Sequence, residues 1–504
     1  MQIAILGYLH FHPIQLTLYF TPLKKRLTKI TRKLKLLPSY GVNMDASESL
    51  TPSASPTPSN KRGWIILAVD IVVLLLLLKF LPFDPKANAG LALMVFVGVL
   101  WLTEAIHVTI TALCIPLLAV GLGLMGTGDA LKAFANPIIF LFFGGFALAT
   151  ALHIQGLDRL IANRLLMAAR GRLSVAVILL FGVTAGLSMW ISNTATAAMM
   201  LPLVLGILSN LDVRHERNTF VFVLLGVAYS ASIGGLGTIV GSPPNAIAAS
   251  ALGLDFLSWM KYGIPIMVVL LPMMFVLMYM MLRPNLKHRF DIELEKVEWN
   301  GKRITAMGIF LLAVVCWITS TFISEALGGV KDLDTIIALS AAVLIGITGV
   351  ASWSQIQKNT EWGVLMLFGG GLTLSAILSS SGASKIMADW MQMTFGESHW
   401  FVIILAVTTF IIILTEFTSN TASAALLVPI FATVAEALGM PVMALTMIIG
   451  IGASCAFMLP VATPPNAIVF GSGYIRQIEM VRVGAVLNVA CIIVISLFAW
   501  FFWL

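Results

Sequence analysis

The chain has 504 residues, of which 59% are hydrophobic and 11% are charged. Soluble domains carry about 25% charged residues, so a chain of this composition has too little polar surface to fold in water. Its apolar runs are continuous and many approach the ~20 residues that a membrane-spanning helix needs, whereas a β-barrel would show alternating segments of about 10 residues. The sequence therefore predicts an all-α polytopic membrane protein.

The positive charge of the chain comes from its first 43 residues. The formal net charge is +7, and seven basic residues with no acidic counterpart lie between positions 24 and 35. Because this excess is local, it gives no reason to expect a nucleic-acid partner. Residues 45–60 are rich in Ser and Pro and predict a disordered linker. We interpret residues 1–60 as a disordered or non-native extension, in which the basic stretch is either an arm facing the lipid headgroups or lies upstream of an alternative start at Met44.

From residue 61 the apolar runs divide the chain into two similar halves. In the first half, residues 61–282, the run 174–211 is apolar except at its centre and has basic residues at both ends, which predicts a re-entrant hairpin. A break at Ser242-Pro243-Pro244-Asn245 divides the next run, 218–256, into a broken helix. The remaining runs of this half predict membrane spans at about 64–81, 89–105, 108–125, 136–156 and 262–282.

The second half, residues 304–504, follows a basic cytoplasmic connector at 283–303. It repeats the order of the first half, with a hairpin at 400–437, a broken helix at 440–475 and a last span at 483–503. Both halves together predict about 11 transmembrane helices plus two re-entrant hairpins. The other spans of this half are predicted at about 304–323, 335–352 and 362–380.

Three sequence landmarks recur in the same order at nearly one offset. Phe143-Gly144-Gly145 returns 225 positions later, Ser192-Asn193-Thr194 returns after 227 positions as Ser419-Asn420-Thr421, and the Pro-Pro-Asn of the first break returns after 221 positions. Basic connectors mark the cytoplasmic side of a membrane protein. They place the N-terminus in the cytoplasm, the C-terminus in the periplasm and the hairpins on opposite faces, so the halves are predicted to be inverted repeats.

Each hairpin carries a Ser-Asn-Thr tripeptide at its tip, and each broken helix carries a Pro-Pro-Asn. A tip buried in the membrane leaves helix-end N–H and C=O groups without partners. Backbone carbonyls and small side-chain oxygens suit a hard cation, and amides at helix N-termini suit an oxyanion. Ser188 precedes Ser192 by one helical turn and Thr415 precedes Ser419 likewise, so each adds a hydroxyl to its tip. The pattern predicts a solute site at the interface of the two repeats.

Neither tip and neither proline break contains Lys or Arg. A bound anion would therefore depend on neutral donors, helix dipoles and bound cations, which favours cation-coupled transport. We interpret Glu416, three residues before Ser419, as a group that orients the tip. The sequence shows no nucleophile–base pair or metal cluster at membrane depth, so we expect no enzyme activity. A channel would not need hairpins that open to opposite sides.

At these residues the chain resembles the divalent-anion/sodium symporter family, and within it the bacterial INDY-type sodium/dicarboxylate symporters. Two Ser-Asn-Thr signatures, each followed by a Pro-Pro-Asn loop, carry this resemblance, which extends over about 60–504. It implies a homodimer in a bacterial inner membrane that works by an elevator mechanism, with sodium as the coupling ion and no organic cofactor. It also implies import of C4 dicarboxylates such as succinate, malate and fumarate, with sulfate, citrate or exchange-type carriage as the alternative.

The resemblance further assigns the binding residues, with Thr418, Gly241 and Ala462 contributing backbone carbonyls. The implied sodium ligands are Ser188, Ser192, Asn193 and Gly241 in the first half and Thr415, Thr418, Asn420 and Ala462 in the second. The implied substrate contacts are Asn193, Thr194, Ser242 and Pro243 on one side and Asn420, Thr421, Thr463 and Pro464 on the other.

Overall fold

The computed structural model describes residues 60–209, 211–290, 298–396 and 398–504, and every regular element in these ranges is a helix. The predicted all-α class is confirmed. An isolated β-bridge pairs Arg172 with Arg289, on the connector between the halves. The predicted N-terminal extension lies outside the described residues up to position 59, and so do residues 291–297 of the connector.

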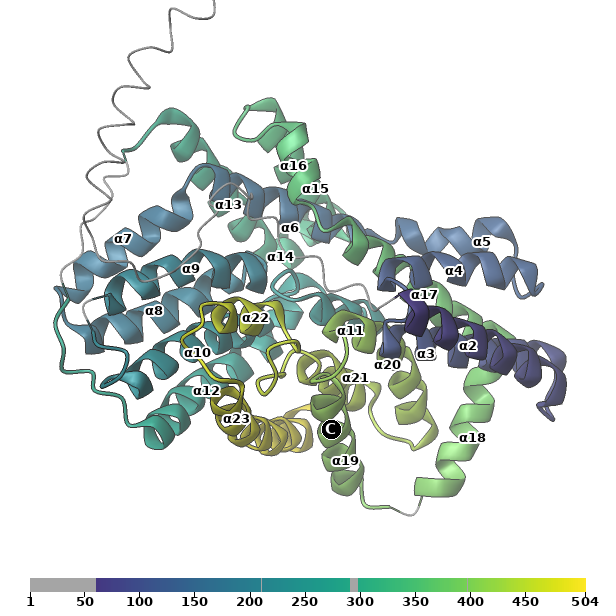
Figure 1. The fold of residues 1–504 in the computed structure, drawn as a ribbon. Coiled ribbons are helices and arrows are strands. Elements are labelled where there is room, and N and C mark those ends of the chain that lie inside the picture. The colour runs from purple at the N-terminus through teal and green to yellow at the C-terminus, as the bar shows by residue number, and fades with distance from the viewer. Residues whose placement is uncertain (1–59, 210, 291–297, 397) are drawn as a thin grey trace, which may run out of the picture. The chain divides into compact units, whose positions relative to one another are not determined.

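The first half places six helices ahead of its hairpin (Figure 1). They are α2 (Asn60–Phe80), α3 (Pro85–Thr103), α4 (Val108–Gly121), the short α5 (Thr127–Lys132) with η1 (Ala133–Ala135), α6 (Pro137–Ile154) and α7 (Leu157–Ala169). The hairpin consists of α8 (Leu173–Ser188) and α9 (Asn193–Leu208). The broken helix consists of α10 (Arg217–Gly234), η2 (Gly235–Gly237) and α11 (Pro243–Leu252), and α12 (Phe256–Leu282) ends this half.

The second half follows the same order around its own hairpin. Ahead of the hairpin lie α13 (Gly301–Ile318), α14 (Ser320–Ala326), α15 (Leu333–Ile347), α16 (Trp353–Asn359), α17 (Trp362–Ser381) and α18 (Ala383–Phe395). The hairpin consists of α19 (Trp400–Leu414) and α20 (Asn420–Ala437). The broken helix consists of α21 (Val442–Gly452) and α22 (Pro464–Gly471), and α23 (Gln477–Phe498) continues into η3 (Ala499–Trp503).

Nine helices of the described part are long and apolar enough to cross a membrane, or ten if the bent pair α18–α19 forms one span. The sequence analysis predicted about 11. Three predicted spans contain only short helices: α4 has 14 residues, α15 has 15, and α21 in the second broken helix has 11. At 1.5 Å per residue, such helices are about 16–23 Å long, less than the ~30 Å of the hydrocarbon core.

The helices α7 and α18 occupy segments that the sequence analysis left unassigned. Both have 13 residues and follow a glycine with positive φ, Gly156 at 64° and Gly382 at 81°. Glycine adopts this left-handed conformation without a Cβ clash, so each glycine turns the chain sharply between two helices. Gly382 follows Gly156 by 226 positions, so the two turns are equivalent in the two halves. Both helices are amphipathic and contain no continuous apolar run, so apolar run length does not predict them.

Two close helix crossings join the halves. A Cβ on Gly144 of α6 would lie 2.5 Å from the Cβ of Ala338 on α15, and a Cβ on Gly370 of α17 would lie 2.7 Å from the Cβ of Ala112 on α4. Gly370 follows Gly144 by 226 positions and Ala338 follows Ala112 by the same number, so the crossings are equivalent. Small residues let membrane helices approach closely. The structure thus aligns the halves here at 226 positions, not at the 225 of the Phe-Gly-Gly landmark.

Phe142 and Phe368 are also 226 positions apart, and their rings contact each other with centroids 5.1 Å apart. A residue that touches its own repeat equivalent lies close to the axis that relates the two halves. The paired contacts of α6 and α17 therefore indicate a two-fold arrangement of these helices. The boundary between halves at 283–303 and their inverted orientation in the membrane stay predictions.

The first broken helix is the most deeply buried element of the described part, because every residue of the apolar window in α10 is buried. The Tyr229 hydroxyl of α10 donates to the carbonyl of Phe457, at 2.7 Å, in the break of the other half. The helix α9 packs against α22, and α11 packs against α20 and α21 (Figure 1). Each hairpin thus lies on the broken helix of the other half, and this cross-packing brings both tips into one region.

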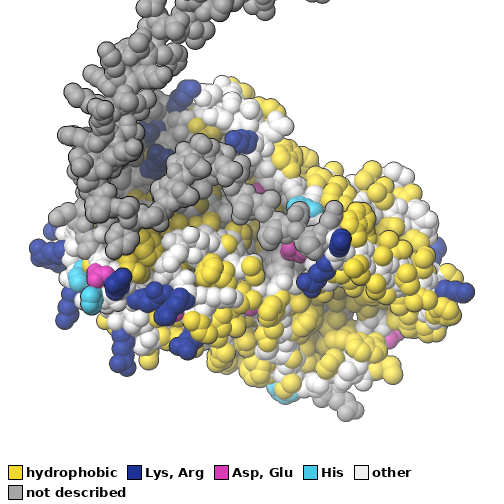
Figure 2. Space-filling view, in the orientation of Figure 1, with side chains coloured by type: hydrophobic (Ala, Val, Ile, Leu, Met, Phe, Trp, Pro, Cys, Tyr) yellow, Lys and Arg dark blue, Asp and Glu magenta, His cyan; other side chains and the backbone are white. Residues whose placement is uncertain are grey.

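Apolar side chains cover most of the surface visible in Figure 2, whereas Lys and Arg gather toward one side. Among the large apolar residues, Phe80, Phe322, Ile347 and Trp390 are all more than half exposed. A soluble monomer rarely exposes contiguous apolar surface of this extent, so this surface faces lipid. The chain is a multi-pass membrane protein.

The crossing at Gly370 predicts a strong effect of added volume. Gly370→Val should lower the thermal unfolding midpoint of the purified protein in detergent, because its Cβ would lie 2.7–2.9 Å from atoms of Ala112 and such overpacking costs about 1–3 kcal/mol. Gly346→Val is the control, since nothing lies within 4 Å of a Cβ at Gly346, in the last turn of α15. Equal midpoints for the two variants would contradict the close crossing.

Candidate functional site

Four helices begin where the hairpin tips meet the breaks: α9 after Ser192, α11 after Ser242, α20 after Ser419 and α22 after Thr463. The hydroxyl oxygens of three of these residues accept a hydrogen bond from the backbone N–H three positions later, at 3.3–3.4 Å. Ser242 makes no such cap, and its Oγ lies 3.0 Å from Ser454 Oγ in the other half. Helix N-termini carry partial positive charge and unpaired N–H groups, so this region favours an anion.

The first-half tip gathers oxygen atoms. Asn193 Oδ1 lies 2.6 Å from Ser188 Oγ, and the same amide position is 3.1 Å from the carbonyl oxygen of Ala231 and 3.2 Å from that of Gly241. Four oxygens therefore face one another with one hydroxyl proton among them. Either the amide turns so that its nitrogen, with two protons, donates to two of the other three oxygens, or a cation lies between the oxygens. Such oxygen ligands are those that a hard cation prefers.

The second-half tip repeats this cluster. Thr415 Oγ1 is 2.6 Å from Asn420 Oδ1 and 2.7 Å from the carbonyl oxygen of Ala453, and its single proton can satisfy only one of them. Ala231 lies in the last turn of α10 and Ala453 directly follows α21, so in both halves the carbonyl comes from the end of the helix that precedes the break. The Thr418 hydroxyl is already engaged, 3.0 Å from the Leu414 carbonyl and 2.7 Å from Ser423 Oγ, which leaves its own carbonyl for a ligand.

The asparagines of the two Pro-Pro-Asn motifs close the breaks. Asn245 Nδ2 donates to the carbonyls of Gly235 at 2.8 Å and Thr238 at 2.7 Å. Asn466 Nδ2 donates to carbonyls ten and seven residues earlier, at 3.1 and 3.0 Å, so the pattern is identical. Both side chains are fully buried. The repeated motif is visible in the sequence, but it does not predict a role for these two asparagines. In the structure they donate hydrogen bonds to backbone oxygens that the breaks leave without helical partners.

Glu416 holds the break of the second half. Its carboxylate accepts from the backbone N–H groups of Phe457, Met458 and Leu459 at 2.7–3.0 Å and from Asn488 Nδ2 of α23 at 2.7 Å. The side chain is 2% exposed. The sequence analysis expected Glu416 to orient its own hairpin tip, but the side chain reaches across to the facing loop. Four donors compensate the buried carboxylate here without a basic partner.

The break of the first half is held differently. Thr238 Oγ1 donates to the carbonyl of Met189 in the hairpin tip and accepts from Gly241 N at 3.1 Å. Met189 precedes Asn193 by four positions, as Glu416 precedes Asn420, so a backbone carbonyl takes the place of the carboxylate. A Cβ on Gly241 would lie 2.4 Å from the Gly235 carbonyl oxygen, so only glycine fits this approach.

The remaining predicted contacts lie on the first turns of the four helices. Thr194 and Thr421 are the second residues of α9 and α20 and are half-buried, and Pro243 and Pro464 are the first residues of α11 and α22. Ala462 is buried just before α22. Among the predicted residues, short polar contacts bring together Ser188, Asn193 and Gly241 in the first half and Thr415 and Asn420 in the second. The structure also adds the carbonyls of Ala231 and Ala453, which a sequence cannot reveal because every residue has a carbonyl.

Two hairpin tips and two broken helices that meet inside a helical membrane protein, with oxygen clusters and helix N-termini facing the junction, define a secondary transporter. The chain matches the family model of the sodium:sulfate symporter transmembrane region over residues 60–504. It belongs to this family, as the resemblance predicted.

Similar proteins agree with this assignment. The chain is 61% identical over 453 residues to a protein of Haemophilus influenzae described as an uncharacterized transporter. This alignment covers 88% of this chain and 98% of the Haemophilus protein. It is 34% identical over 476 residues to the sodium-dependent dicarboxylate transporter SdcS of Staphylococcus saprophyticus, with 87% and 90% covered. The solved structure of the Alcanivorax borkumensis YdaH transporter matches with a TM-score of 0.54 and 12% identity over 82% of this chain and 97% of that one, a likeness of fold alone.

The contacts of Glu416 predict that its charge stabilises the second break. Glu416→Gln places an amide N–H group against backbone N–H groups, so the unfolding midpoint in detergent should fall by an amount equivalent to about 1–3 kcal/mol. Glu436→Gln is the matched control, because Glu436 is an exposed residue of α20. A midpoint for Glu416→Gln as high as that of the control would show that the carboxylate does not hold the loop.

Proposed function

We propose that the protein is a sodium-coupled symporter that imports C4 dicarboxylates, such as succinate, malate and fumarate, across a bacterial inner membrane. The observation that carries the proposal is the pair of matching oxygen clusters around Asn193 and Asn420. In each, a hydroxyl, a side-chain amide and a backbone carbonyl lie together, and with the amide oxygen turned inward this donor set suits sodium as a hard cation. The name of the relative SdcS, a sodium-dependent dicarboxylate transporter, supports the choice of cation and anion.

The anion is bound without a basic side chain. No Lys or Arg occurs in the segments 188–194, 235–245, 415–421 or 453–466. A dianion at membrane depth is costly unless charges or dipoles compensate it. Two sodium ions at the tips, together with the N-termini of α9, α11, α20 and α22, provide this compensation. Substrate binding therefore depends on sodium being bound first, and this dependence couples the two fluxes.

The two halves would each hold one end of the substrate. In the first half Asn193, Thr194, Ser242 and Pro243 would face one carboxylate, and in the second half Asn420, Thr421, Thr463 and Pro464 would face the other. Hydroxyl and amide groups and free helix-end N–H groups are suitable donors for carboxylate oxygens. Sodium would be held by Ser188, Ser192, Asn193 and Gly241 at one tip and by Thr415, Thr418, Asn420 and Ala462 at the other.

Translocation would move both tips together. The cross-packing of α9 on α22 and of α11 on α20 makes the two hairpins and two broken helices one mechanical unit. We propose that this unit moves across the membrane against the other helices, as in an elevator, within a homodimer. It crosses when it is fully loaded or empty, because a partly loaded unit would dissipate the sodium gradient.

Sulfate, citrate or exchange-type carriage is the second candidate. The description of the family names sulfate. A small tetrahedral dianion would need only one half of the substrate contacts, whereas a C4 dicarboxylate would span both. Competition between labelled succinate and unlabelled sulfate or citrate during uptake distinguishes these cases.

Uptake of labelled succinate into proteoliposomes tests the coupling. We expect an inward sodium gradient to drive accumulation and a choline gradient of equal size to give none, because the oxygen clusters need a small hard cation. Liposomes without protein are the control. Uptake of equal rate in choline would remove sodium coupling from the proposal.

Variants of the two tip asparagines test the site. Asn193→Ala and Asn420→Ala should each abolish sodium-driven uptake, because each removes an amide that serves both cation and substrate, while the unfolding midpoint stays close to that of the wild type. Asn359→Ala is the control, since Asn359 is an exposed residue at the end of α16. Wild-type uptake in either tip variant would discredit the assignment.

A further inference from the structure

Val240, in the first break, is packed against another helix, whereas the equivalent residue of the second break, Val461, is exposed. Val240 packs on α6, where its Cγ1 lies 3.2 Å from the Cβ position of Gly145. Val461 follows Val240 by 221 positions, the offset of the two Pro-Pro-Asn motifs, and is therefore its equivalent. Val461 is 83% exposed. Asn245 and Asn466 make the same hydrogen bonds in the two breaks, so the two valines occupy matching places in the loops but have different surroundings.

The two hairpin tips differ in the same way as the two breaks: an aromatic residue is packed in the first tip and exposed in the second. Trp190, in the first tip, stacks on Phe256 and Trp317 with ring centroids 5.9 and 6.2 Å apart. Its equivalent in the second tip, 227 positions later, is Phe417, which is 71% exposed. The first-half side of the unit is thus docked against α6 and α13, and the second-half side lacks an equivalent contact among the described residues.

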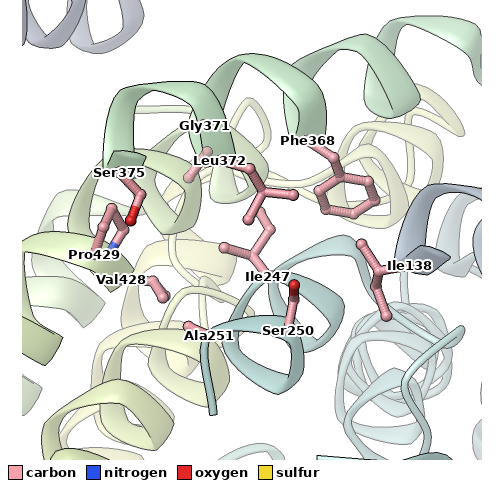
Figure 3. A pocket seen from close by; sticks show the side chains of 11 residues that line it. Ile138, Ile247, Ser250, Ala251, Phe368, Gly371, Leu372, Ser375, Val428 and Pro429 are labelled. Atoms are coloured by element: carbon pink, nitrogen blue, oxygen red, sulfur yellow. The ribbon is translucent and has the colours of Figure 1, made fainter. Parts of the chain in front are cut away.

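The glycine on which Val461 would rest, Gly371, borders a cavity, and in this state it packs on Ala425 of α20, with 3.1 Å between Ala425 Cβ and the Cβ position of Gly371. Gly371 of α17 follows Gly145 of α6 by 226 positions, so it is the equivalent of the glycine on which Val240 rests. Gly371 lines a cavity of about 60 Å³ between α6, α11, α17 and α20. Figure 3 shows Gly371, Leu372 and Phe368 of α17 facing Ile247 of α11 across this space. The other lining residues are Ile138, Ser250, Ala251, Ser375, Ala425, Val428 and Pro429.

We propose that this cavity is the second docking position of the mobile unit, and that it receives Val461 in the opposite access state. The exchange follows from the equivalence of the two halves. In one state Val240 contacts Gly145, and in the other state the equivalent residues, Val461 and Gly371, contact each other. The inference rests on the proposed transport function, and it adds which residues hold the two end states.

The chemistry of the cavity fits this use. Its walls are apolar except for the hydroxyls of Ser250 and Ser375, so a valine can enter without leaving a charge unpaired. Glycine at the contact allows the backbone of the loop to approach the helix closely, as Gly145 does for Val240. An equivalent contact in each end state makes their energies similar, which a reversible carrier needs because a strongly favoured state would trap it.

Two cysteine pairs test the exchange. One pair is Val240→Cys with Ala149→Cys, and the other is Val461→Cys with Ser375→Cys; Ser375 and Ala149 lie one turn beyond the two glycines and are themselves 226 positions apart. Both pairs are made in a background in which the partly exposed Cys114 and Cys316 are replaced by Ser. Membrane vesicles are treated with a short thiol-specific crosslinker, and the linked peptides are identified by mass spectrometry.

We expect the first pair to crosslink without substrate and the second to crosslink when sodium and succinate allow the unit to move. Each crosslink should abolish uptake, and reduction should restore it. A second variant pair avoids cysteine chemistry: Ser375→Trp, which fills the cavity, should abolish uptake, whereas Ala376→Trp on the exposed neighbouring position should leave it intact.

Failure of this inference and failure of the proposed function give different results. If wild-type protein takes up succinate with sodium but the second pair never crosslinks and Ser375→Trp transports normally, the docking position is wrong. If the second pair crosslinks in vesicles that show no sodium-driven uptake, the docking exchange stands and the proposed substrate or coupling ion is wrong.

Discussion

The rest of this structure depends on how backbone groups at two interrupted helices are satisfied where lipid offers no hydrogen bonds. Asn245 and Asn466 solve the problem in the same way, each by binding carbonyls ten and seven residues earlier. The carbonyls of Ala231 and Ala453, at the ends of the preceding helices, lie beside the tip side chains Asn193 and Thr415. The breaks, held in this way, thus place backbone oxygens next to both tips.

The two halves reach matching geometry with different chemistry. The second break is held by the carboxylate of Glu416, with three backbone N–H groups and Asn488 as donors. In the first break the Thr238 hydroxyl bridges Met189 and Gly241. A buried carboxylate beside only the second tip makes the electrostatic environments of the two tips unequal, since a negative charge in a low-dielectric surrounding attracts a cation. In the proposed function the two sodium sites would therefore differ in cation affinity although their ligands are equivalent.

Glycine and alanine determine how the unit meets the helices around it. Gly144 and Gly370 let α6 and α17 cross α15 and α4 at close range, and in the proposed mechanism these four helices form the support against which the unit moves. The next glycine along each helix faces the unit: Gly145 carries Val240, and Gly371 borders a cavity. An apolar surface with small residues lets one packed body move along another without breaking ion pairs, which suits a carrier that changes state repeatedly.

The sequence by itself determined the membrane class, the hairpins, both breaks and the residue types at the tips, because apolar run length and polar interruptions at lipid depth have few structural solutions. Only the tertiary structure decided which backbone oxygens surround the tips, that Glu416 serves the facing loop, and that α4, α15 and α21 are short. It also decided the 226-position register and the unequal exposure of Val240 and Val461. The physical reason is that carbonyls and packing partners are set by contacts between segments far apart in the chain, which local composition does not encode.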